Sequence, residues 1–174
     1  QAGVKVNLGM LAYKVHSKIC LISRRERGRL AYYANLATGN FNEKSAGSYC
    51  DHSIFTVHKG ITADLKQLFR GLDKKTFYKG YKFIITSPLE MRTSIYELIN
   101  QEIKYAEMWE NAYMILKMNS LSDEDVIAKL YEASNAGVTI QLIIRGMCCL
   151  VPNVKGYSEN IKVISIVDRF LEHA

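Results

Sequence analysis

Hydrophobic and polar residues alternate in the first third of the chain, in runs separated by turn residues. The runs 12–22 and 29–38 have the two-residue period of strands, and Gly28 marks the turn between them, so the pattern predicts a β-hairpin. A polar loop with a short helix is expected at 39–49, and a third strand at 51–57.

A helical period replaces this alternation over residues 62–72. The apolar positions of the predicted helix are Leu65, Leu68, Phe69 and Leu72. Thr62 lies three residues before this apolar stripe, and its hydroxyl makes it the predicted N-cap.

The second half of the chain alternates between strand and helix patterns. Strands are predicted at 81–87, 112–120, 138–146 and 161–166. Helices are predicted at 89–106, 123–137 and 167–173. Ser87 opens the first of these helices, with Pro88 at its first position, and Gly137 ends the second. This order is typical of a mainly parallel sheet flanked by helices, so the expected fold class is α/β (α+β). A boundary near 76–82 divides the chain into 1–80 and 81–174.

The composition suits one or two folded units, because 48% of the 174 residues are hydrophobic. The 23 Lys and Arg residues exceed the 17 Asp and Glu residues, and the net charge of +6 favours an anionic partner. No apolar run reaches the roughly 20 residues needed to cross a bilayer. The chain begins at Gln1 without a signal-peptide pattern, and we expect it to be cut from a longer protein.

The four cysteines are expected to be small apolar residues of a reduced compartment. Cys148 and Cys149 are adjacent, which is not the spacing of a zinc pair. His52 and His58 fall in no motif, so we expect them to be structural. Trp109 is expected to pack against its neighbours.

Lys14, His16 and Lys18 occupy alternate positions of the first predicted strand and therefore share one face. Such a face suits an anion, because neutral imidazole is a nucleophile and a neighbouring ammonium can hold a phosphoryl oxygen. The alternative is an exposed strand edge with ordinary cations.

The loop after the hairpin offers a second set of phosphate-binding groups. Gly39 permits close backbone approach, Asn40 and Asn42 offer amide donors, and Lys44 adds a positive charge. The alternative is a simple Asn/Gly turn.

Five segments spread over nearly the whole chain carry a more specific signal. They are KVHSKICLI, ANLATGNFNEKSAGSYCDHSIFT, LKMNSLSD, IIRGMCCLVPNVKGYSENI and SIVDRFLEH. In this order they resemble the C-terminal catalytic part of bacterial polyphosphate kinase of the type that synthesises long polyphosphate chains. The resemblance implies two phospholipase D-like domains with mixed sheets flanked by helices, both incomplete: the C-terminal part of the first over 1–80 and the N-terminal part of the second over 81–174.

The resemblance also implies an activity and its residues. The activity is reversible transfer of the terminal phosphoryl group of ATP to polyphosphate through a phosphohistidine, with the isolated fragment expected to be inactive. By position, His16 matches the phosphorylated histidine, Tyr49 and Arg145 match ATP contacts, and His173 matches a second catalytic histidine at the nucleotide.

Our reasoning from the residues adds Lys18, Asn40 and Asn42 as phosphate donors. The remaining expectations follow from the resemblance, which implies Mg²⁺ as a cofactor whose ligands lie before Gln1. The expected partners are ATP or ADP and inorganic polyphosphate, without nucleic acid. We further expect a homo-oligomeric full-length enzyme in the cytoplasm, whose membrane association, if any, is peripheral at the inner face of the cell membrane.

Two other functions remain open. A phospholipase D-like phosphodiesterase or nuclease also uses paired histidines, with an Asp five residues after the lysine, where this chain has Ser23. A non-enzymatic basic module that binds a polyanion would need no nucleophile at all.

Overall fold

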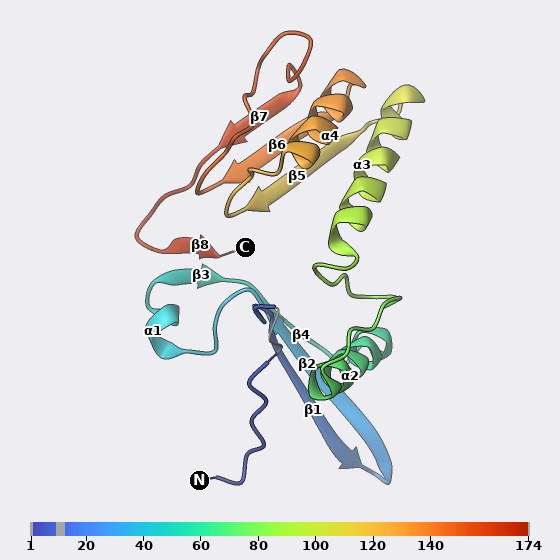
Figure 1. Ribbon diagram of the computed structural model, residues 1–174, viewed down its shortest axis with the longest axis vertical. Coiled ribbons are helices and arrows are strands. Elements are labelled where there is room, and N and C mark those ends of the chain that lie inside the picture. Colours follow the sequence, from blue (N-terminus) through green and yellow to red (C-terminus); the bar gives the residue numbers. More distant parts are fainter. Residues whose placement is uncertain (1, 10–12, 174) are drawn as a thin grey trace. The chain divides into compact units, whose positions relative to one another are not determined.

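The computed structural model describes residues 2–9 and 13–173 (Figure 1). Two compact units emerge from the contacts between residues: Gln1–Ala46 with Asp51–Glu90, and Gly47–Cys50 with Met91–Ala174. The mixture of sheets and helices confirms the predicted α/β class. No helix in the described part of the chain is long and apolar enough to cross a membrane.

The first unit contains an antiparallel sheet with the strand order β1-β2-β4. Strands β1 (Lys18–Glu26) and β2 (Arg29–Ala37) form the predicted hairpin, and β4 (Ser53–Thr56) pairs with the other edge of β2. Arg27 and Gly28 both have positive φ, at 46° and 79°. A two-residue turn of this kind matches the twist of a hairpin, and glycine adopts it without steric cost.

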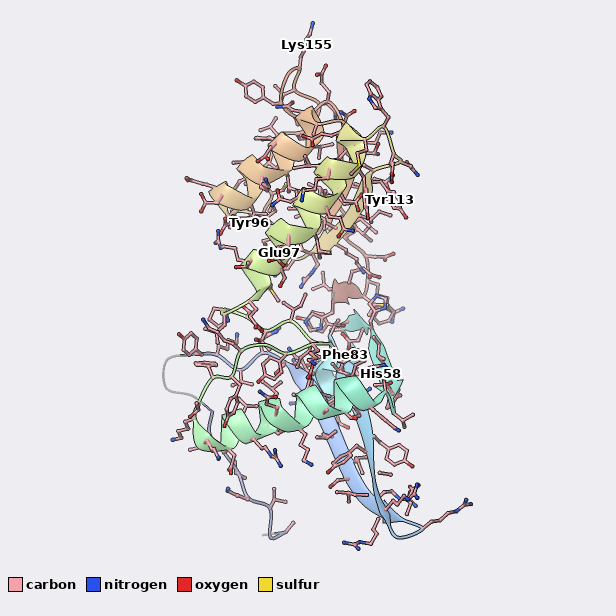
Figure 2. All side chains as sticks on the ribbon, turned by 90° about the vertical axis from the view of Figure 1, so that its right-hand side faces the viewer. His58, Phe83, Tyr96, Glu97, Tyr113 and Lys155 are labelled. Carbon is pink, nitrogen blue, oxygen red and sulfur yellow. The ribbon has the colours of Figure 1, made fainter. Side chains whose placement is uncertain are left out.

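Helix α2 (Lys59–Lys74) begins earlier than the apolar stripe indicated, so the prediction of Thr62 as its N-cap is wrong. His58 is the N-cap, and its side chain accepts a hydrogen bond from the backbone N–H of Ile61 at 3.3 Å. The imidazole also packs edge-on against Phe83, with ring centroids 4.9 Å apart (Figure 2). His58 is therefore structural, as expected.

The second unit is built on a parallel sheet in the order β5-β6-β7, which confirms the predicted parallel arrangement. Its strands are β5 (Tyr113–Met118), β6 (Thr139–Ile144) and β7 (Ile161–Ile164). Helices α3 (Met91–Glu107) and α4 (Glu124–Asn135) follow the predicted alternation along the chain, and Figure 1 shows them beside this sheet.

The core of the second unit lies between this sheet and its two helices. Side chains that alternate along β6 join residues of α3 and α4 in one buried cluster, which includes Ile103, Leu130, Ile140, Leu142 and Ile144. Asp123 caps α4 by accepting a hydrogen bond from the N–H of Val126 at 3.1 Å, and Gly137 follows the helix with φ of 99°. The C-terminal end agrees with the stop predicted at Gly137.

The predicted strand at 81–87 does not form. The backbone N–H groups of Lys82 and Phe83 donate instead to the carboxylate of Asp64 in α2, at 2.9 and 2.7 Å. This side chain takes the place of a neighbouring strand as the hydrogen-bond acceptor. The following helix begins at Met91 rather than at Pro88, whose peptide bond with Ser87 is cis.

Three further predictions differ from the structure, two in the second unit and one in the first. The predicted final helix at 167–173 is replaced by strand β8 (Leu171–His173), which pairs with β3 (Tyr49–Asp51). The predicted strand 51–57 is accordingly divided between β3 and β4, while the short helix α1 (Glu43–Ala46) forms as expected. Trp109 is 97% exposed, so the expectation that it packs is wrong.

Candidate functional site

His16 lies in an irregular segment immediately before β1, not within a strand. The reason is the length of the partner strand: Lys18 pairs with Ala37, the last residue of β2, so the pairing of β1 with β2 extends no further toward His16. The prediction that Lys14, His16 and Lys18 share one strand face is therefore wrong, although the histidine is exposed to solvent.

Lys18 is nevertheless next to the histidine ring. Its ammonium lies 3.2 Å from Nδ1 and 3.4 Å from Nε2 of His16, and it donates a hydrogen bond to the His16 carbonyl oxygen at 2.7 Å. The carbonyl contact fixes the lysine where a positive charge faces both ring nitrogens. An anionic group attached to the imidazole would therefore lie beside a cation.

The loop after β2 is held closely against the start of β4. Thr38 and His52 exchange hydrogen bonds of 3.0 Å, from N–H to carbonyl in one direction and from N–H to hydroxyl in the other. A Cβ atom on Gly39 would lie 1.8 Å from a carboxylate oxygen of Asp51. Gly39 thus serves close packing of the loop on the neighbouring chain.

Asn40 and Asn42 both contact helix α1. The Asn42 side-chain oxygen accepts hydrogen bonds from the N–H groups of Lys44 and Ser45, at 2.9 and 3.3 Å, which is an N-cap arrangement. The Asn40 amide donates to the Ser45 hydroxyl at 3.5 Å. The role of these asparagines in phosphate binding stays a prediction.

Tyr49 and His173 come from distant parts of the chain and meet in the second unit. Tyr49 lies on β3 and His173 on β8, and the N–H of Leu171 donates to the carbonyl of Ser48 at 3.1 Å. The two rings have centroids 4.7 Å apart and an interplanar angle of 32°. Pairing of the short strands therefore places the phenol beside the second predicted histidine.

Arg145 follows β6 at the carboxyl end of the parallel sheet and lines a small pocket. The other lining residues are Lys117, Met118, Ile143, Ile166 and Glu172. The Nε atom of Arg145 is buried and has no hydrogen-bond partner among the described residues. Because buried polar groups are almost always hydrogen-bonded, this donor marks a place for an acceptor such as a phosphate oxygen.

The backbone beside Arg145 is also tightly constrained. A Cβ atom on Gly146 would lie 2.8 Å from the carbonyl oxygen of Asn119. The N–H of Gly146 donates to this same oxygen at 2.7 Å. This close approach fixes the direction in which the chain leaves β6, and with it the base of the arginine side chain.

Lys117 and Glu172 form an ion pair in the same pocket. Their side chains are 26% and 27% exposed, so the pair is largely withdrawn from solvent. The sequence interpretation missed both residues. The available signals were a lysine near the end of a predicted strand and a carboxylate directly beside His173.

Positive charge is concentrated in the first unit. It holds 15 of the 23 basic residues and only 6 of the 17 acidic ones. The second unit, which contains Tyr49, Arg145 and His173, therefore has more acidic than basic residues.

No group of three or more His, Cys, Asp or Glu side chains in the described part of the chain could hold a metal ion.

A parallel sheet with a cationic pocket at the carboxyl ends of its strands is typical of α/β proteins that bind anionic ligands. A family model described as polyphosphate kinase C-terminal domain 1 matches residues 1–78, and one described as polyphosphate kinase C-terminal domain 2 matches residues 84–174. The chain belongs to the polyphosphate kinase family.

Individual relatives agree with this assignment. The chain is 47% identical to the polyphosphate kinase of Vibrio parahaemolyticus and 40% identical to that of Escherichia coli K12, over 99% of its length and 25% of theirs. A crystal structure of polyphosphate kinase from Porphyromonas gingivalis matches with a TM-score of 0.83 and 41% identity, over 95% of this chain and 27% of that one. The chain thus spans about a quarter of the length of these relatives.

Proposed function

We propose that the full-length protein transfers the terminal phosphoryl group of ATP reversibly to inorganic polyphosphate, through a phosphohistidine at His16. One observation carries this proposal. Tyr49, Arg145 and His173, separated by many residues in sequence, lie in one compact unit. There the Tyr49 and His173 rings lie against each other, and Glu172 beside His173 shares a pocket with Arg145. We retain 1–80 and 81–174 as the two proposed phospholipase D-like domains.

His16 is the proposed nucleophile. An unprotonated ring nitrogen forms a bond to the γ-phosphorus of ATP, while the bond from that phosphorus to the bridging oxygen breaks and ADP leaves. A terminal oxygen of polyphosphate then attacks the same phosphorus, which lengthens the polymer by one unit and restores the imidazole. Lys18, 3.2 Å from Nδ1, places its charge beside the transferred group.

Arg145, Tyr49 and His173 are the proposed nucleotide contacts. The buried Nε of Arg145 lacks an acceptor, and a guanidinium keeps its charge at any physiological pH, so it suits a phosphate oxygen. The adjacent rings of Tyr49 and His173 can bind through their faces or their polar atoms. In the proposed role, His173 donates a hydrogen bond or a proton to a phosphate oxygen.

Mg²⁺ would neutralise phosphate charge during such a transfer. The described residues offer no cluster that fits it, and no step above depends on it. Mg²⁺, the homo-oligomeric state, the cytoplasmic location and any peripheral membrane contact stay predictions for the full-length protein.

Two rival functions make different predictions. A phosphodiesterase or nuclease would cleave a diester, although Ser23 occupies the place of the acidic residue expected of it. A binding module would use the charge of the first unit, where basic residues greatly outnumber acidic ones, and would not require His16.

The deciding experiment is labelling of the full-length protein with γ-32P-ATP. His16→Gln should abolish the acid-labile, base-stable label, and added ADP should recover labelled ATP from the wild type. His52→Gln is the matched control, because His52 is also exposed and lies in the first unit. Labelling that survives in His16→Gln would refute the assignment, and diester cleavage without labelling would favour the nuclease.

A further inference from the structure

Strand β8 carries two side chains with different partners. Glu172 pairs with Lys117 of β5, and the His173 ring lies against Tyr49 of β3. Successive residues of a strand point to opposite sides. The Glu172 carboxylate of β8 therefore faces the pocket, and the His173 imidazole faces Tyr49. Any shift of Glu172 relative to Lys117 would therefore displace His173.

The strands that bear Tyr49 and His173 are short. Strands β3 and β8 contain three residues each and form a two-stranded sheet, shown side by side in Figure 1. A two-stranded sheet is at best marginally stable without further packing. Its place in the unit must therefore be fixed by other contacts, and the ion pair supplies one from the parallel sheet.

Lys117 connects this small sheet with Arg145. It is the second-last residue of β5, it pairs in register with Ile143 of β6, and both residues line the pocket with Arg145. The parallel sheet thus positions the Arg145 guanidinium through β6. Through Lys117, the same parallel sheet also positions the small sheet formed by β3 and β8. The ammonium is already engaged by a carboxylate, whereas the Arg145 Nε has no partner among the described residues.

We propose that Lys117 and Glu172 are positioning residues, which set the spacing of the adjacent Tyr49 and His173 rings relative to Arg145 and so assemble the nucleotide site. This inference rests on the proposed function, because it assigns a common ligand to those three residues. In this role neither member of the pair needs to contact the reacting phosphoryl group. Their effect is on nucleotide binding and alignment.

The test uses the full-length protein and the variants Lys117→Met, Glu172→Gln and the charge exchange Lys117→Glu with Glu172→Lys. Each single variant should raise KM for ATP about tenfold or more, since small misplacements of binding groups are costly. KM for polyphosphate should change less than about twofold. The exchange variant should recover most of the loss, because it restores the attraction between the two positions.

Lys129→Met is the matched control. Lys129 forms an ion pair with Glu132 within α4 of the same unit, away from the pocket. It should leave both KM values unchanged. Thermal midpoints of all variants are measured alongside, because a merely structural role would lower stability and alter both substrates together.

Three results would overturn the inference: wild-type KM for ATP in both single variants, equal changes for ATP and polyphosphate, or no recovery in the exchange variant. The last result would mean that Lys117 acts directly through its own charge. Labelling of His16 in the wild type is measured in parallel. If it is present while the variants behave as wild type, only the positioning role fails; if it is absent, the proposed function fails and the positioning role with it.

Discussion

The contact between Lys18 and His16 leads to a prediction that separates two similar lysines. Lys14 and Lys18 each lie two residues from the histidine, and the Lys18 ammonium lies 3.2 Å from Nδ1 and 3.4 Å from Nε2 of its imidazole. Lys18→Met should therefore impair formation of the phosphohistidine. Lys14→Met should have little effect.

The expected magnitude follows from Coulomb attraction. Two unit charges about 4 Å apart in water attract by about 1 kcal/mol, and the exposure of His16 makes the aqueous value appropriate. A phosphoryl group carries a charge of about −2, so removal of the ammonium costs about 2 kcal/mol. This corresponds to a loss of roughly 30-fold in the equilibrium between phosphorylated and free histidine, since each 1.4 kcal/mol is about tenfold.

The assay is the labelled fraction of the full-length protein at a fixed ratio of ATP to ADP. Lys18→Arg provides a second comparison, because it keeps the charge and should retain most of the label. Equal labelling in Lys14→Met and Lys18→Met, whether both are reduced or both are normal, would refute the reasoning. A high salt concentration should narrow the difference between Lys18→Met and the wild type, because exposed charges are screened.

Three further predictions concern the second unit. Leu130→Ala should lower the free energy of unfolding in urea by about 2–5 kcal/mol, because the Leu130 side chain is fully buried. Leu98→Ala, at a position that is 59% exposed, should lower it by less than about 1 kcal/mol. Equal losses in the two variants would contradict the assigned core. Gly146→Ala should raise KM for ATP about tenfold, because its Cβ would meet a backbone oxygen 2.8 Å away beside the arginine; an unchanged KM would argue against the arginine as a nucleotide contact. The hydrogen bond from Arg92 holds the pKa of Asp123 below its usual value. The ionised Asp123 carboxylate therefore stabilises the fold fully above the ordinary aspartate pKa, and this stabilisation is lost as the pH falls through the lowered pKa of the folded state. Asp123→Asn keeps a capping oxygen but has no charge, so the difference in thermal midpoint between this variant and the wild type should shrink on acidification. A difference that stays constant from pH 7 to pH 3 would contradict the link between the Asp123 pKa and stability.

Local pattern predicted much of the fold. The hairpin followed from alternation and a turn at Gly28, and α4 followed from a helical pattern ended by Gly137. The parallel sheet followed from apolar strands separated by helices. These signals act over a few residues, so neighbouring side chains are sufficient to produce them.

The predictions failed where a segment had several available partners. Residues 81–87 contain apolar residues suited to a strand, but their backbone is bound by Asp64 of α2. The final segment has a pattern compatible with a short helix, yet β3 provides an edge to which it pairs as a strand. The available edge or carboxylate decides such cases, and a local pattern does not contain that information.

The sequence by itself determined the hairpin and the parallel sheet, since both depend on residue type and spacing along the chain. Its resemblance to polyphosphate kinase indicated the family and supplied the residues expected to bind the nucleotide. The tertiary structure alone decided that His16 precedes its strand, that the Lys18 ammonium contacts its ring, and that Lys117 pairs with Glu172, 55 residues away. The physical reason is the range of the interactions. Periodicity records which side of an element is buried, whereas an ion pair or a pairing of short strands depends on where the rest of the chain comes to lie.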